Sequence, residues 1–244
     1  MTRPPLTTRF EDPAVSALMA GMGQLSETDH EAMRHLKVVH RFIGRQRSLI
    51  HEGDPIRQVR IICKGWAIRS RRLDQTRRQI LDVALPGDIV GLHLDGKSTS
   101  ICDVEALTPC EVGEIDADAL ERVAHQNRGV ASSLHQNLTC QLARANDQVL
   151  RLGRMTAYER VCSFLMDIYD RQRLEGALRG HVDFPITQAI VADLLGLSVV
   201  HVNRQVMRLR REGLVSLQRR QLVIHDEQRM TSIASGRAHM VAAE

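Results

Sequence analysis

After two short helical stretches near the start of this chain of 244 residues, three hydrophobic patterns follow one another, and each predicts a different kind of structure. Two helical patterns, Ala14 to Met22 and Glu27 to Leu36, come first, the second preceded by Ser26. From Val38 to Ile115, short apolar runs with a period of two are separated by Gly-, Pro- and Asp-rich turns. Many short strands with regular turns are typical of an antiparallel barrel or roll. We therefore expect a roll with space for a small ligand.

The second pattern, which follows Asp116, has the period of a helix. After a break near Asn127, apolar residues recur at intervals of 4, 4, 4, 3, 4 and 3: Val130, Leu134, Leu138, Leu142, Ala145, Val149 and Leu152. A helix of about 25 residues is nearly 40 Å long, more than one small domain needs. A near-heptad seam of this kind packs well against a second copy. We predict dimerisation through the first six of these residues; the alternative is a core helix packed on its own sheet.

The third pattern, TQAIVADLLGLSVVHVNRQVMRLRREGLV over 187–215, predicts two short helices joined by a tight turn. Thr187 and Ser198 are N-cap residues, and Gly196 can adopt the positive φ that ends the first helix. Val202, Val206 and Leu209 recur at helical spacing toward a core. The other faces of the second helix carry apolar, Asn and Arg side chains: Val199, Val200, Asn203, Arg204 and Arg208.

After Gly213, two short apolar runs surround Gln218 to Gln221, which predicts a hairpin, or wing, with a basic tip. From Thr187 to His225 the chain carries six Arg and two acidic residues, a balance of +4 that equals the net charge of the whole chain. Basic groups neutralise phosphates, and Arg and Asn hydrogen-bond base edges. We therefore predict a winged helix-turn-helix that binds double-stranded DNA; the alternative is a helical hairpin with a solvated basic face. The predicted contacts are Thr187, Gln188, Ser198, Val199, Val200, His201, Asn203, Arg204, Arg208, Arg219 and Arg220.

Composition excludes several other classes of protein. No segment approaches the roughly 18 unbroken apolar residues of a membrane span, so we expect a cytoplasmic protein with no membrane partner. The five cysteines are an odd number and form no C-x-x-C pair, which argues against a disulfide framework or a zinc site. A redox-active thiol stays open. The roll sequence groups no nucleophile, base and oxyanion donor, so we expect no enzyme, no metal and no cofactor.

Together these elements predict an α+β chain: a sensor domain with an antiparallel β-roll over 1–126, a dimerisation helix and hinge over 127–153, a winged helix-turn-helix over 154–226 and a tail over 227–244. From Leu36 to Ile224 this order resembles the Crp-Fnr superfamily of bacterial transcription regulators. The resemblance rests on these motifs: Ile50-His-Glu-Gly-Asp54, Lys64-Gly65, Leu85-Pro-Gly-Asp-Ile89-Val-Gly91, Ala157-Tyr-Glu-Arg-Val161 and the 187–215 stretch. It implies a homodimer on a palindromic site, with RNA polymerase as a further partner.

The sensor region departs from both main branches of that superfamily. In the cyclic-AMP-binding branch a Glu follows the glycine matching Gly91 and an Arg-Ser pair comes later, whereas here Leu92 and His93 follow and Thr99-Ser100-Ile101-Cys102 replaces the pair. A cyclic phosphate would be buried without its counter-charge, so the resemblance implies weak or no cyclic-AMP binding. The oxygen-sensing branch uses N-terminal cysteines, but none precedes Cys63.

The effector therefore stays open, with haem on His93, thiol oxidation and no effector at all among the alternatives. The candidate effector pocket comprises Gly91, Leu92, His93, Ser100 and Cys102.

The second helix of the 187–215 stretch also departs from the superfamily. Arg204 matches the Arg that reads guanine in both branches, while the Glu they share is replaced by Val200. Glu accepts a hydrogen bond from cytosine, but Val meets only apolar surface such as a thymine methyl. We expect an altered central base preference with the palindromic geometry kept. Two alternatives are a small-molecule-binding or thiol-redox sensor whose winged domain docks protein rather than DNA, and an enzyme or carrier.

Overall fold

The computed structural model describes residues 12, 14–15, 26–74, 77–92, 99–174 and 181–235. The chain divides into two compact units, one comprising Met1–Thr76 and Leu81–Arg144, the other Arg77–Ile80 and Ala145–Glu244. The division therefore falls inside the long helix, which was expected to form a segment of its own. Of the predicted helix from Ala14 to Met22, Ala14 and Val15 are helical and the rest lies outside the described residues.

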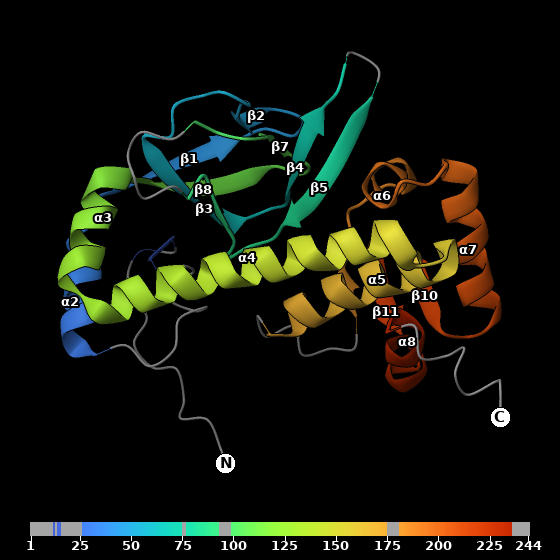
Figure 1. The fold of residues 1–244 in the computed structure, drawn as a ribbon. Helices are drawn as coiled ribbons and strands as arrows, with labels where there is room; N and C mark the ends of the chain where they lie inside the picture. The colour runs from blue at the N-terminus through green and yellow to red at the C-terminus, as the bar shows by residue number, and fades with distance from the viewer. Residues whose placement is uncertain are drawn as a thin grey trace. The chain divides into compact units, whose positions relative to one another are not determined.

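Apart from residues 78–80 of one strand, the predicted antiparallel roll lies in the first unit, and it is made of two four-stranded sheets (Figure 1). The strand orders are β1-β8-β3-β6 and β2-β7-β4-β5. The strands are β1 (Val38–Ile43), β2 (Ser48–Ile50), β3 (Gln58–Lys64), β4 (Ala67–Arg72), β5 (Arg78–Ala84), β6 (Ile89–Val90), β7 (Asp103–Ala106) and β8 (Cys110–Asp116). Successive side chains of β3 point to opposite faces of its sheet and so contribute to two cores. Ile62 packs between the two sheets, whereas Val59 and Ile61 pack against helices.

The helix-facing core is closed by α2 (Glu27–Arg34), α3 (Ala117–Gln126) and the first part of α4 (Arg128–Arg154). Ser26 and Asp29 form a capping box at the start of α2, and Asp116 caps α3. Val130 and Leu134 of α4 are fully buried in this core beside Met33 and Leu120. The predicted dimer seam is therefore wrong at Val130 and Leu134, which cover their own sheet instead.

The second unit contains α5 (Ala157–Leu174), β9 (Val182–Asp183), α6 (Gln188–Leu195), α7 (Val199–Arg211), β10 (Val215–Gln218), β11 (Gln221–Ile224) and α8 (Glu227–Ala234). The strands form one antiparallel sheet of order β10-β11-β9. Strand β9, which precedes the helix-turn-helix, has only two residues, Val182 and Asp183.

The segment predicted to be a tail contributes to the core of the second unit. Its helix α8 buries Met230 and Ile233, and its Glu227 accepts a hydrogen bond from Tyr169 of α5 at 2.8 Å. Residues 236–244 lie outside the described part of the chain. No helix among the described residues is long and apolar enough to span a membrane.

Candidate nucleic-acid interface

Both helices of the helix-turn-helix begin at the N-cap residues predicted from the sequence. The hydroxyl of Thr187 accepts the N–H of Ile190 at 3.4 Å, and the hydroxyl of Ser198 accepts the N–H of His201 at 3.2 Å. Gly196 ends α6 with φ 61° and ψ 40°, in the left-handed region that a side chain disfavours. The crossing of α6 and α7 is thus set by local sequence, as predicted.

Arg160, which the sequence prediction missed, ties this turn to the preceding helices. Its guanidinium donates to the carbonyls of Met155 at 2.9 Å, Leu152 at 2.9 Å and Leu195 at 3.0 Å. One side chain therefore joins the end of α4, the start of α5 and the end of α6. Its place in the 157–161 motif was the available signal.

Helix α7 has one buried face and one exposed face. Val202, Val206 and Leu209 are buried, as their spacing predicts. The side chains predicted to contact DNA near the start of α7 are exposed, with Val199 at 46% and Val200 at 77%. Gln188 of α6 donates to Asn203 of α7 at 3.5 Å, and the ring of His201 lies 3.1 Å from the Ser198 hydroxyl.

Arg204 stands out among these residues because it is exposed and, among the residues the structure describes, it has no hydrogen-bonded or ionic partner. An arginine kept free at the surface retains all five donors of its guanidinium. That is the donor arrangement needed for bidentate contact with a guanine edge.

The wing has the predicted basic tip, in an unusual backbone conformation. Gln218 pairs with Gln221, which leaves Arg219 and Arg220 as a two-residue turn with φ of 49° and 62°. Positive φ at both positions is the requirement of a type I′ hairpin turn, and Asn or Gly usually supplies it. Positive φ strains the backbone of any residue that has a Cβ, so both arginines of this turn are in a strained conformation. Both side chains are exposed.

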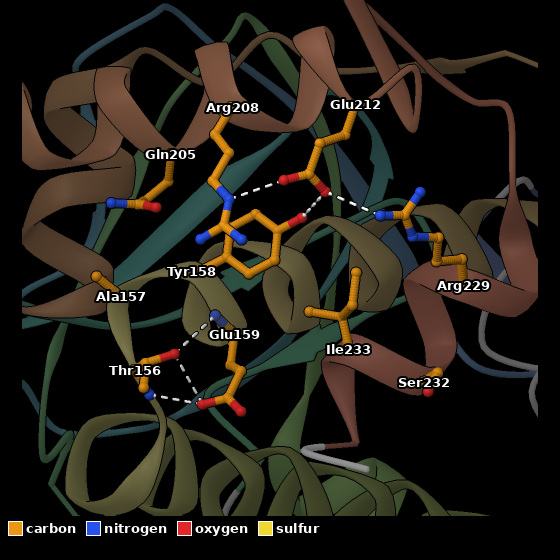
Figure 2. A pocket seen from close by; sticks show the side chains of 10 residues that line it. All are labelled: Thr156, Ala157, Tyr158, Glu159, Gln205, Arg208, Glu212, Arg229, Ser232 and Ile233. Atoms are coloured by element: carbon orange, nitrogen blue, oxygen red, sulfur yellow. Dashed lines mark hydrogen bonds and ion pairs between the residues drawn. The ribbon is translucent and has the colours of Figure 1, made fainter. Parts of the chain in front are cut away.

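Arg208, a predicted DNA contact, is bound by residues of its own domain. Its Nε donates to Glu212 at 2.8 Å, and its guanidinium carbon lies 4.0 Å from the centre of the Tyr158 ring (Figure 2). The Tyr158 hydroxyl donates to the same carboxylate at 2.7 Å, and Arg229 of α8 approaches it at 3.4 Å. Arg208 is therefore bound to two residues of its own domain, although 52% of its side chain stays exposed. Thr187, Gln188 and the other exposed positions stay predictions.

Burial alone would raise the pKa of the Glu212 carboxyl, but hydrogen bonds from Tyr158 and Arg208 and the charges of Arg208 and Arg229 bring the pKa below its usual value. Burial, and the hydrogen bond to Glu212, raise the pKa of the Tyr158 hydroxyl. The two groups are therefore held as carboxylate and neutral phenol. They line a cavity of about 540 Å³ between α5, α7 and α8 (Figure 2).

Part of the predicted dimer seam on α4 is exposed. Leu138, Leu142 and Val149 have exposed fractions of 39%, 62% and 71%, and Ala145 between them is exposed as well. We call these four residues the exposed seam. Apolar side chains at spacings of 4, 3 and 4 on one helix face are typical of a surface that a partner covers.

The candidate effector pocket is only partly brought together. Gly91 has φ 70° beside Ile50, and the Ser100 hydroxyl donates to the Cys102 carbonyl at 2.7 Å. Leu92, however, is buried in the helix-facing core, whereas Cys102 packs against the core between the sheets, so the structure does not bring these two together. His93 lies outside the described residues.

All five cysteines are free thiols. Burial raises the pKa of Cys102 and Cys110 and brings that of Cys63 to about 11 and that of Cys162 to about 12, so these thiols stay protonated and weakly reactive. Cys140 on α4 is exposed. Within the described ranges no group of three His, Cys, Asp or Glu side chains could hold a metal ion.

A β-roll, a long helix and a winged helix-turn-helix with an exposed arginine on its second helix are together typical of a DNA-binding protein. Comparison with known proteins agrees: residues 159–233 match the Crp-like helix-turn-helix domain, and residues 40–127 match the cyclic nucleotide-binding domain. Transcriptional activatory protein AadR of Rhodopseudomonas palustris is 30% identical over 219 residues, which cover 89% of this chain and 90% of that protein.

Transcriptional activator protein FnrL of Cereibacter sphaeroides is 30% identical over 192 residues, or 75% of each chain. The structure of FixK2 from Bradyrhizobium japonicum superposes with a TM-score of 0.74 at 29% identity, covering 81% of this chain and 98% of that one. The chain belongs to the Crp-Fnr superfamily. It is a DNA-binding transcription regulator and not an enzyme.

Proposed function

We propose that this regulator acts as a homodimer on a palindromic DNA site and reads each half-site with α7. The observation that carries the proposal is Arg204, which is exposed and unpartnered in the described part of the chain while the opposite face of its helix is core. Arg204 would contact guanine, and Val200, in place of the Glu of relatives, would meet apolar base surface. Asn203 and Gln188, which are already hydrogen-bonded together, would complete the base-contacting surface.

The remaining contacts would go to the phosphate backbone. Arg219 and Arg220 project from the wing tip, and the N-terminal turns of α6 and α7 begin at Thr187 and Ser198. Helix N-termini and arginines both favour phosphate oxygens, and such contacts are independent of sequence. Arg219→Ala is therefore expected to weaken binding to every sequence alike and to reduce the salt slope by about one.

The exposed seam of α4 supports the dimer. A second copy related by a two-fold axis would cover Leu138, Leu142, Ala145 and Val149, and would place two α7 helices on successive major grooves. Because the named relatives are transcriptional activators, RNA polymerase is the further partner we propose. A protein that binds promoter DNA in bacteria works in the cytoplasm, which is the location we propose.

Binding-site selection from random duplexes tests the function. The expected product is an inverted repeat with a guanine read in each half and a central preference different from that of relatives that keep the Glu. Selection of unrelated sequences without two-fold symmetry would contradict the proposal.

A further inference from the structure

Helix α7 carries four arginines, and their side chains differ in the partners that they bind. Arg204 is unpartnered among the described residues, whereas Arg210 donates to the Leu217 carbonyl of the wing. Arg208 is stacked on Tyr158 and bound to Glu212. Arg204 and Arg208 are one helical turn apart, so the second would follow the first along a groove if its guanidinium were free.

Glu212 stands at an unfavourable place for an acidic residue. It is the C-cap of α7, where the helix dipole disfavours negative charge, and it follows Arg208 in the less favourable order of an i, i+4 pair. Even so, its carboxylate is only a quarter exposed and receives donors from three helices: Tyr158 of α5, Arg208 of α7 and Arg229 of α8. The carboxylate thus binds Arg208 at a helix end that its negative charge does not stabilise.

Tyr158 restricts the same guanidinium from its other side. A separation of 4.0 Å between the guanidinium carbon and the ring centre is within contact distance for cation–π stacking. The ring is itself oriented by the 2.7 Å hydrogen bond to Glu212 (Figure 2). Arg208 is therefore held by an ion pair to Glu212 and by stacking on Tyr158, whose hydroxyl is hydrogen-bonded to the same carboxylate.

We propose that Glu212 and Tyr158 are positioning residues that determine specificity by holding Arg208 away from DNA. A free arginine at this place would contact phosphate, which adds affinity for every sequence and lowers the ratio of specific to non-specific binding. With Arg208 held back, α7 presents Arg204 beside Val200 and Asn203 as its base-reading side chains. The inference rests on the proposed role of α7 as the reading helix.

The test compares salt-dependent binding of the full-length variants to the selected site and to unrelated duplex DNA. Glu212→Gln should release Arg208, because a neutral amide binds the guanidinium weakly. The expected result is a slope of log affinity against log salt that is steeper by about 0.9 per bound half-site on unrelated DNA. The affinity ratio between 50 and 200 mM salt should then grow about 3.5-fold for each added contact.

Glu227→Gln is the matched control for the change of net charge. Glu227 is likewise held by a tyrosine and an arginine of α5, Tyr169 at 2.8 Å and Arg173 at 2.6 Å, but it binds no residue of α7. The proposal requires the steeper slope in Glu212→Gln and not in Glu227→Gln. It also requires that adding Arg208→Ala to Glu212→Gln abolishes the gain.

Arg208→Ala alone keeps the proposal testable if Glu212→Gln fails to fold. In the otherwise unchanged protein it should leave the salt slope and the sequence preference as they are. A slope reduced by about one would show that Arg208 already contacts phosphate and would overturn the proposal. Equal slopes for the two Glu→Gln variants would overturn it as well. Arg204→Ala reports separately on the reading helix, because an unchanged sequence preference there would refute the role of α7 itself.

Discussion

The turn of the helix-turn-helix gives a stability prediction that can be worked from the structure. Gly196 has φ +61°, and a Cβ added there would lie 3.3 Å from Cδ2 of Leu152. The left-handed conformation costs a residue with a Cβ about 1 to 2 kcal/mol. The Leu152 contact is tight, but it involves the end of a flexible side chain, so it adds only a few tenths. Gly196→Ala should therefore destabilise the second unit by about 1 to 2 kcal/mol.

Substitutions at two other glycines separate the backbone cost of positive φ from the cost of the contact with Leu152. Gly213 has φ +70° with nothing within 4 Å of an added Cβ, so Gly213→Ala isolates the backbone cost. Gly153 also has open space but lies within α4, where alanine is preferred by roughly 0.5 to 1 kcal/mol. Gly153→Ala should thus stabilise while Gly196→Ala and Gly213→Ala destabilise.

Urea unfolding followed by circular dichroism measures all three variants. The single tryptophan, Trp66, is buried in the roll, so its fluorescence reports on the first unit separately. The reasoning is refuted if Gly196→Ala is as stable as the parent protein, or if Gly153→Ala and Gly196→Ala shift the midpoint in the same direction.

Three further predictions address the dimer, the effector and pH. Leu142→Glu, on the exposed seam, should convert the dimer to monomer in sedimentation, whereas Leu134→Ala should lower stability by about 2 to 5 kcal/mol and leave association intact. Titration calorimetry with cyclic AMP should show no micromolar isotherm, and such an isotherm would contradict the argument from the missing counter-charge. The lowered pKa of the Glu212 carboxyl means that its stabilising bonds are fully present above the unfolded pKa of about 4.3 and are lost as pH falls through the lower folded value. The stability difference between the parent and Glu212→Gln should thus shrink only below that pH, and a difference independent of pH would disprove the assignment.

Local patterns predicted the parts of this fold that local interactions build. The caps at Thr187, Ser198 and Ser26 follow from single side chains bonding to nearby N–H groups. The turn at Gly196 follows from a backbone conformation that glycine tolerates. Each of these interactions spans only a few residues, so the sequence window that predicts the element also contains its cause.

Periodicity alone could not identify what covers a helix face. The series from Val130 to Val149 is continuous in the sequence, yet its first two members are buried under the roll and its later members are exposed. Both surfaces select apolar residues at the same spacing, so the pattern could not distinguish them.

The contacts of Arg208 with Tyr158 and Glu212 could not be predicted from the sequence for a different reason. Tyr158 and Glu212 are 54 residues apart, and Arg229 comes from α8, in the segment that was predicted to be a tail. An arginine on a polar helix face looks the same in sequence whether it is free or bound. The tertiary structure, through residues brought from α5 and α8, decides which arginines remain available.

The role of Arg204 in reading a base from α7 is tested most directly by quantitative binding. The parent protein and Arg204→Ala are each titrated with all single-base variants of the selected site. The prediction is a loss of about 1 to 3 kcal/mol on the selected site, with discrimination lost at one symmetric pair of positions and kept elsewhere. An equal loss on every sequence, or no loss at all, would contradict it.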